Sequence, residues 1–123
     1  MASHFFIIED DPIVRIDLEG MIAVQYPSAR VDSVASWTEL GPALLNSGPE
    51  SAVFVRGTLI SRDERLEKMI RAAATRQTRI VIIGARDQTN IPAFFVEPPF
   101  TSDMMLAALA GHVQEDGEPP PAA

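Results

Sequence analysis

Three features of the sequence predict a doubly wound α/β domain built on a parallel sheet of five strands. First, four short apolar runs are continuous rather than alternating, as in strands covered by helices on both faces. Second, helical patterns separate most of these runs, which is the alternation typical of this class. Third, 123 residues with 46% hydrophobic and 22% charged side chains have the size and composition of one globular domain. The four runs are Phe5–Ile8, Ala52–Val55, Ile80–Ile83 and Ala93–Val96.

The first predicted helix follows the first strand and runs from Ile13 to Gln25. Asp11 supplies a capping carboxylate before it, and Pro12 suits the first helical position because proline has no backbone N–H to lose there. Its apolar residues form two stripes, so we expect this helix to be packed on two sides. One stripe is Val14, Leu18, Met21 and Ile22, and the other is Ile13, Ile16 and Val24.

The middle of the chain predicts an edge strand and two further helices. The run Ala29–Ala35 alternates in polarity, which is typical of a strand at the edge of a sheet. The segments 36–39 (Ser-Trp-Thr-Glu) and 61–64 (Ser-Arg-Asp-Glu) both fit a capping box. Gly41-Pro42 interrupts the first of these helices, which we expect to be short or kinked. The second continues with a buried stripe of Leu66, Met69, Ile70 and Ala73.

The connection between the fourth and fifth strands is unusually short. Ala85–Pro92 has eight residues, too few for a crossover with a covering helix, so we expect the fourth helix to be shortened or absent. The sheet would then expose apolar surface there, as at an interface or a ligand groove, unless the loop and the last helix close over it. That last helix begins near Thr101 or Ser102 and ends near Val113. We therefore predict one domain over residues 1–114 and a disordered, acidic, proline-rich tail over 115–123.

Composition excludes several classes of function. The formal net charge of −7 argues against general nucleic-acid or anionic-membrane binding. The chain contains no Cys, which excludes disulfides and thiol chemistry. No apolar run approaches the ~18 residues that span a bilayer, and no basic segment precedes an apolar one as in a signal peptide. We expect a cytoplasmic domain.

The basic residues are concentrated in one stretch. Residues 56–86 hold eight of the ten Lys and Arg residues but only three acidic ones, a net charge of +5 within a chain of −7. Such asymmetry indicates either a partner-binding face or a solvated helix face in which ion pairs four residues apart compensate one another. The basic residues are Arg56, Arg62, Arg65, Lys68, Arg71, Arg76, Arg79 and Arg86.

The N-terminal segment 5–18 (Phe-Phe-Ile-Ile-Glu-Asp-Asp-Pro-Ile-Val-Arg-Ile-Asp-Leu) resembles the opening of bacterial response-regulator receiver domains. The resemblance extends over residues 5–113, and Glu97-Pro98-Pro99-Phe100 matches the family's Lys-Pro-Phe ending of strand five. It implies a CheY-like sheet with strand order 2-1-3-4-5. It also implies that Glu9 and Asp10 match the acidic pair that holds Mg²⁺ in the family, beyond the carboxyl ends of the strands.

The reacting residues of the family are not retained. Arg56 stands where a receiver carries its phosphoacceptor Asp, and an arginine cannot form an acyl phosphate. Gly84 stands at the switch hydroxyl, and Pro98 at the lysine that contacts the phosphoryl group. The resemblance is therefore to a degenerate receiver, or pseudo-receiver.

Charge suggests a role for Arg56. Without a metal, Glu9 and Asp10 would repel each other, and a guanidinium supplies a fixed positive charge and several donors. We hypothesise that Arg56 pairs with Glu9 or Asp10, stands in for Mg²⁺ and locks the domain in one state. The alternative is that Arg56 points to solvent and the acids cap the first helix. We expect no cofactor and no resident metal, with at most weak Mg²⁺ binding by Glu9 and Asp10.

The sequence favours an interaction module over an enzyme, since it has no Gly-rich phosphate loop and no nucleophile beside an oriented base. The expected partner is another signalling protein (a histidine kinase, a regulator or an output protein) or a second copy of the chain, with no nucleic acid and no membrane. The alternatives are a small-molecule sensor that uses the gap left by the fourth helix and a receiver phosphorylated at another aspartate, Asp11 or Asp63. The candidate partner surface is Arg86, Asp87, Asn90, Met104, Met105 and Leu109.

Overall fold

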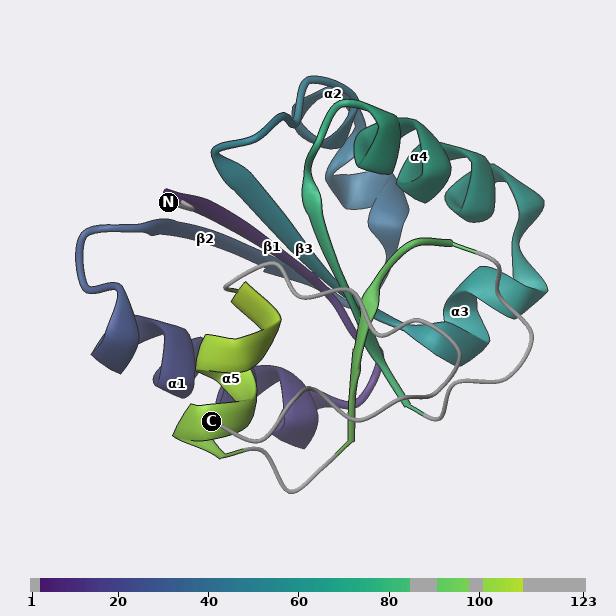
Figure 1. Cartoon of the computed structure of the whole chain (residues 1–123). Coiled ribbons are helices and arrows are strands. Elements are labelled where there is room, and N and C mark those ends of the chain that lie inside the picture. Colours follow the sequence, from purple (N-terminus) through teal and green to yellow (C-terminus); the bar gives the residue numbers. More distant parts are fainter. Residues whose placement is uncertain (1–2, 85–90, 98–100, 110–123) are drawn as a thin grey trace.

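The structure, a computed structural model, describes residues 3–84, 91–97 and 101–109. It contains a five-stranded parallel sheet with the order β2-β1-β3-β4-β5, as predicted (Figure 1). The strands are β1 (His4–Ile8), β2 (Arg30–Val34), β3 (Ser51–Arg56), β4 (Arg79–Ile83) and β5 (Phe94–Val96). The helices are α1 (Pro12–Gln25), a 3₁₀ turn η1 (Trp37–Glu39), α2 (Gly41–Leu45), α3 (Gly57–Arg62), α4 (Glu64–Thr75) and α5 (Ser102–Leu109).

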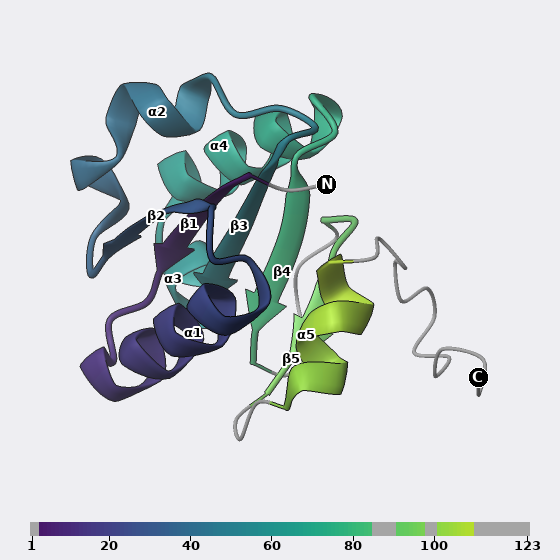
Figure 2. The ribbon, with the colours of Figure 1, turned by 90° about the vertical axis from the view of Figure 1, so that its left-hand side faces the viewer.

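Two hydrophobic clusters cover the two faces of this sheet. Side chains of α2 and α4 pack on one face, around Phe6, Val53 and Ile82. Side chains of α1 and α5 pack on the other, around Phe5 and Phe54. Figure 2 shows the two pairs of helices on opposite sides of the strands. Because successive residues of a strand point to opposite faces, the continuous apolar runs that predicted these strands serve both clusters.

Strand register brings the ends of β1 and β3 to one edge of the sheet. Ile8 pairs with Val34 of β2 on one side and with Val55 of β3 on the other. The residues that follow, Glu9 and Arg56, therefore lie next to each other at the carboxyl edge. This is the edge at which open parallel α/β sheets bind their ligands.

Helix α1 begins as predicted but is packed on one side only. The side chain of Asp11 accepts a hydrogen bond from the backbone N–H of Ile13, and Leu18 and Ile22 are buried. The second predicted stripe is wrong as a buried face, because Ile13, Ile16 and Val24 are 77%, 65% and 77% exposed. Apolar periodicity marks a stripe, but no described element covers this one.

The two predicted capping boxes are also wrong. Ser36 makes no capping hydrogen bond, because its hydroxyl is bonded to that of Thr38 at 2.9 Å. Ser61 lies inside α3 and donates to the carbonyl of Gly57, while Asp63 caps the following helix α4. Asp63 has an extended backbone and separates the predicted helix, α4, from α3, a short helix that was not predicted.

The predictions of a missing fourth helix and of a disordered tail concern residues 85–90 and 115–123, which lie outside the described residues. In the part that is described, the last helix begins at Ser102, and the Thr101 hydroxyl accepts from the backbone N–H of Met104. Within the same part, no helix has the length and apolar character needed to cross a membrane.

Candidate functional site

A buried ion pair closes the carboxyl edge of the sheet between β1 and β3. The Glu9 carboxylate is fully buried, and the Arg56 side chain is 21% exposed. Arg56 Nε donates to Glu9 Oε1 at 2.8 Å, and Arg56 Nη2 approaches the same oxygen at 2.5 Å. Of the two arrangements considered from the sequence, the structure contains the one in which Arg56 turns inward, and its partner is Glu9.

The remaining polar atoms of Glu9 have partners as well. Its second carboxylate oxygen, Oε2, accepts from the backbone N–H of Asp11 at 3.0 Å. Its backbone N–H donates to the carbonyl of Val34, and its carbonyl accepts from Arg15 Nη1 at 2.8 Å. A buried charge is tolerated when it is paired and hydrogen-bonded in this way. Glu9 is therefore fixed by three neighbouring elements.

The other two acids of the N-terminal run have different environments. The Asp10 side chain is 54% exposed, and Arg62 Nη2 lies 3.9 Å from its Oδ2, a loose surface contact. Asp11 caps α1 through a hydrogen bond of 2.9 Å from the N–H of Ile13. Of these three consecutive acids, Glu9 forms the buried ion pair, Asp10 is exposed and Asp11 caps α1.

These residues do not fit a Mg²⁺ ion. Mg²⁺ needs oxygen ligands in near-octahedral geometry, with carboxylates free to face it. Both carboxylate oxygens of Glu9 already accept hydrogen bonds from the protein, and the neighbouring strand presents the cation of Arg56. Of the other two acids here, Asp10 makes a loose contact with Arg62, and Asp11 uses its Oδ1 as the cap of α1. Across the described residues, no cluster of three or more potential ligands could hold a metal ion.

The position expected for the switch hydroxyl carries no side chain. Gly84 follows β4 with φ of +122°, a conformation that other residues rarely adopt, and its N–H donates to the carbonyl of Val96 at 2.8 Å. The backbone here is thus specific for glycine and is tied to β5. Pro98, the other expected switch position, lies outside the described residues.

The described part of the expected partner surface is not open. Met104 and Leu109 are half-buried and pack against the cluster beneath α1 and α5. Nothing is described of the Met105 side chain or of Arg86, Asp87 and Asn90.

Among the described residues, three of the four large hydrophobic side chains that are exposed lie on α1, at Ile13, Ile16 and Val24, and we call these three residues the α1 stripe. A hollow of about 300 Å³ beside it is lined by Ile16, Val24 and Gly20 among others. The periodicity of the sequence signalled the stripe but not its exposure.

A second polar contact near this edge was not predicted. Trp37 Nε1 donates to Asp63 Oδ2 at 2.8 Å, which joins η1 to the start of α4. Asp63 Oδ1 accepts from the N–H groups of Arg65 and Leu66. The pKa of Asp63 is held below its ordinary value, chiefly by the Trp37 hydrogen bond and further by those two amides. A cavity of about 370 Å³ lies beside Trp37.

Comparison with known proteins identifies the class of fold. No protein-family model and no curated protein matches the chain. Solved structures of response-regulator receiver domains do match it, and the sheet order is theirs, so the fold is that of a receiver domain.

Two such structures are similar to this chain. A response regulator receiver domain protein from Bacillus halodurans C-125 superposes with a TM-score of 0.65 at 14% identity, over 93% of this chain and 100% of that one. The response regulator StyR gives 0.56 at 20% identity, over 89% of this chain and 58% of that one. At such identities the likeness concerns the fold.

Proposed function

We propose that this chain is a phosphorylation-independent interaction module in bacterial two-component-type signalling, acting in the cytoplasm and without catalytic activity of its own. The observation that carries the proposal is the Arg56–Glu9 ion pair at the edge where a receiver accepts its phosphoryl group. The receiver-type fold supports the signalling context.

The chemistry of phosphoryl acceptance supports phosphorylation independence. An acceptor must be a carboxylate nucleophile, and a cation must neutralise the incoming phosphoryl oxygens. The acceptor position holds a guanidinium, which is a cation and not a carboxylate nucleophile. Its Nε and Nη2 atoms are bonded to Glu9, so much of its positive charge is already balanced by a carboxylate rather than left for an incoming anion.

The alternative acceptors are already engaged. The Oδ1 atom of Asp11 caps α1, and both carboxylate oxygens of Asp63 accept hydrogen bonds from the indole and the backbone of the protein. Phosphorylation of Asp63 would remove one of these hydrogen bonds, and phosphorylation of Asp11 would place a bulky group on the residue that caps α1. These contacts favour a chain without a working acceptor over one that uses an atypical aspartate.

A single conformational state is part of the proposal. A switch needs a ligand that binds two conformations with different affinity. Here the Arg56–Glu9 ion pair stands where a metal and a phosphoryl group would bind in a receiver. Gly84, at the position of the switch hydroxyl, has no side chain that could respond to a phosphoryl group. The domain would then present one constant surface to its partner.

The α1 stripe is the surface we assign to that partner. Exposed apolar residues that form a contiguous patch are typical of protein contacts. Acidic side chains accompany the stripe along α1, at Asp17 and Glu19, so a complementary protein would combine an apolar strip with basic residues at its rim. The partner in this proposal is another signalling protein.

The experiment is capture of binding partners from the native cell with a tagged chain. The Ile16→Asp variant tests the α1 stripe, and Leu45→Asp is a matched control, because Leu45 is also apolar and 55% exposed but belongs to α2 on the opposite face. We expect Ile16→Asp to lose the captured signalling protein and Leu45→Asp to keep it.

Independence from phosphorylation is tested in the same capture. Wild-type chain taken from cells with and without their phosphodonor kinases should retain the same partner to the same extent. A partner that is captured equally well by Ile16→Asp, or only when the kinases are active, would contradict the proposal.

A further inference from the structure

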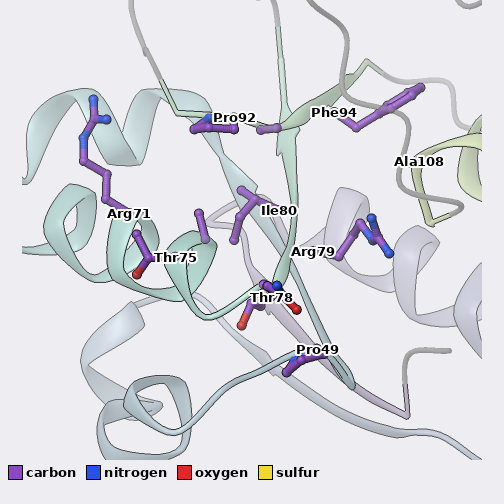
Figure 3. A pocket seen from close by; sticks show the side chains of 12 residues that line it. Pro49, Arg71, Thr75, Thr78, Arg79, Ile80, Pro92, Phe94 and Ala108 are labelled. Carbon is purple, nitrogen blue, oxygen red and sulfur yellow. The ribbon is translucent and has the colours of Figure 1, made fainter.

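A groove opens at the amino-terminal edge of the sheet, opposite the Arg56–Glu9 site. Its volume is about 670 Å³, and it crosses the starts of β4 and β5, with Arg79 and Phe94 as the first residues of those strands. We call it the amino-edge groove. Figure 3 shows its lining, with Arg71 of α4 at one side and Arg79 and Ala108 at the other.

The chemistry of the groove is apolar in the middle and basic at its sides. Ile80, Ala93 and Phe94 are buried and form its apolar part. Arg79 is exposed, and no ion pair of the described residues involves it. Arg71 is 42% exposed, and its Nε donates to Glu67 Oε2 at 3.0 Å. The described lining contains no carboxylate. Such a groove suits an extended, acidic segment with apolar side chains between or beside its charges.

The chain itself carries a segment of that chemistry next to the groove. Helix α5 reaches the groove at Ala108, and the described residues end one position later. Residues 110–123 then follow, with the acids Glu115, Asp116 and Glu118, three consecutive prolines and no Lys or Arg. Fourteen residues extend to roughly 45 Å, far more than the ~5 Å between neighbouring strands.

We infer that the amino-edge groove is the docking site of the chain's own acidic, proline-rich segment 110–123. Its carboxylates face Arg71 and Arg79, and Pro119–Pro121, which favour the preformed polyproline II conformation, pack on the apolar middle. Because the segment is tethered at Ala108, its effective concentration is on the order of millimolar, so weak intrinsic affinity is enough for binding. This inference goes beyond the proposed function and does not depend on it.

The test uses the absence of cysteine from the chain. The Ala122→Cys substitution creates a unique attachment site for a nitroxide spin label, and the full-length protein is observed by ¹⁵N NMR with the label oxidised and then reduced. We expect the oxidised label to weaken the amide signals of Thr75, Gln77 and Arg79 at the groove. The signal of Ala35, near the opposite edge, should keep its intensity.

A tethered but unbound tail is the first control. The same label is placed on a chain with Glu115→Gln, Asp116→Asn and Glu118→Gln, which keeps the tether and the prolines but removes the acidic charges. The groove signals should recover most of their intensity, and added salt should produce the same recovery in the labelled wild-type tail, because salt screens exposed charges. Equal signal loss with the acidic and neutral tails would overturn the inference.

Groove variants form the second arm. Arg79→Glu should release the tail, whereas Arg65→Glu, an equal charge change on an exposed residue of α4 that does not line the groove, should not. Adding Glu118→Arg to the Arg79→Glu chain should restore the loss of the groove signals, because the two opposite charges are then exchanged. In a mixture of labelled unenriched chain and unlabelled ¹⁵N chain, loss at the groove would show docking between molecules and would contradict docking within one chain.

Discussion

At the level of single residues, the Arg56–Glu9 ion pair determines what the carboxyl edge of the sheet can do. A carboxylate removed from water is costly unless a cation and hydrogen-bond donors replace the solvent. Here Arg56 supplies the cation, and the N–H of Asp11 supplies a further donor. The same contacts that stabilise the buried charge also occupy the atoms that a metal would need.

The first prediction follows from that burial. Arg56→Met should lower the free energy of unfolding by about 3–5 kcal/mol, because it leaves Glu9 buried without its partner. Urea denaturation at neutral pH measures the loss. The loss should shrink in the double variant with Glu9→Gln, which removes the buried charge.

A matched control separates this effect from the loss of any arginine. Arg62 forms the exposed contact of 3.9 Å with Asp10, so Arg62→Met should change stability by less than about 1 kcal/mol. Equal effects of Arg56→Met and Arg62→Met would contradict the structural role given to the buried pair.

The sequence could predict that Arg56 pairs with an acidic residue, but it could not predict whether that residue is Glu9 or Asp10. Continuous strands predict a parallel sheet, and the resemblance to receiver domains implies that the first and third strands are neighbours, so the charges that follow them were expected at one place on the carboxyl edge. Whether Glu9 or Asp10 takes the arginine depends on which side chain points inward. That is decided by the turn into α1, where the N–H of Asp11 bonds to Glu9.

The second prediction concerns Asp63. Its pKa is lowered chiefly by the Trp37 hydrogen bond, so it contributes stability above its ordinary pKa of about 3.9 that is lost as the pH falls through the lowered value. Trp37→Phe should raise the pKa of Asp63 and flatten the dependence of stability on pH below about 4. A ¹³C NMR titration of the carboxyl group, with Thr38→Ala as control, measures it. An unchanged pKa in Trp37→Phe would show that the indole is not the cause.

At the level of elements, α1 combines an exposed apolar stripe with a glycine in its middle. Glycine destabilises a helix interior because it loses more backbone entropy than alanine. A Cβ added to Gly20 would meet no atom within 4 Å, so nothing in the described structure requires a glycine there. Its position beside Ile16 and Val24 is consistent with close approach by a partner.

The third prediction is therefore that Gly20→Ala stabilises the isolated protein by about 0.5–1 kcal/mol. Gly57→Ala is the control, because its Cβ would lie 3.2 Å from Ile82 Cγ2, closer than an ordinary van der Waals contact, so this variant should gain less stability than Gly20→Ala. Urea midpoints of both variants give the comparison. A loss of stability in Gly20→Ala would show that the helix is packed there after all.

The elements differ in how well the sequence predicted them. Four strands followed from continuous apolar runs, because burial on both faces leaves a strong pattern within four or five residues, and the edge strand β2 followed from alternating polarity. The second stripe of α1 could not be read correctly, since periodicity shows which residues share a face and not whether another element covers it. The start of α4 was misplaced because Ser61 and Asp63 are both good capping residues, and only tertiary contact with Trp37 favours Asp63.

At the level of the whole molecule, three residues of the basic stretch 56–86 make internal contacts. Arg56 is paired with Glu9, Arg71 with Glu67, and Arg76 donates to the carbonyls of Ser47 and Leu44. Arg65, Lys68 and Arg79 are exposed and take part in no ion pair of the described residues, but the chain as a whole has a net charge of −7. We therefore expect no general affinity for nucleic acid, which is itself strongly anionic.

The fourth prediction tests that distribution. We expect no steeply salt-dependent binding of the protein to a fluorescent DNA duplex or RNA strand. Fluorescence anisotropy at low and at physiological ionic strength measures this. Steeply salt-dependent binding that is lost in Arg65→Glu would instead assign a nucleic-acid role to the exposed part of the basic stretch.

The most direct test of the closed carboxyl edge is the intact mass of the purified chain after incubation with acetyl phosphate and Mg²⁺. We propose that Arg56 stands at the acceptor position, and its side chain is paired with Glu9, so the mass of the wild-type protein should remain unchanged. The Arg56→Asp variant, which places a carboxylate at that position, is measured beside it under the same conditions. A gain of one phosphoryl group by the wild-type chain would contradict phosphorylation independence, and Asp10→Asn, Asp11→Asn and Asp63→Asn would then identify the acceptor.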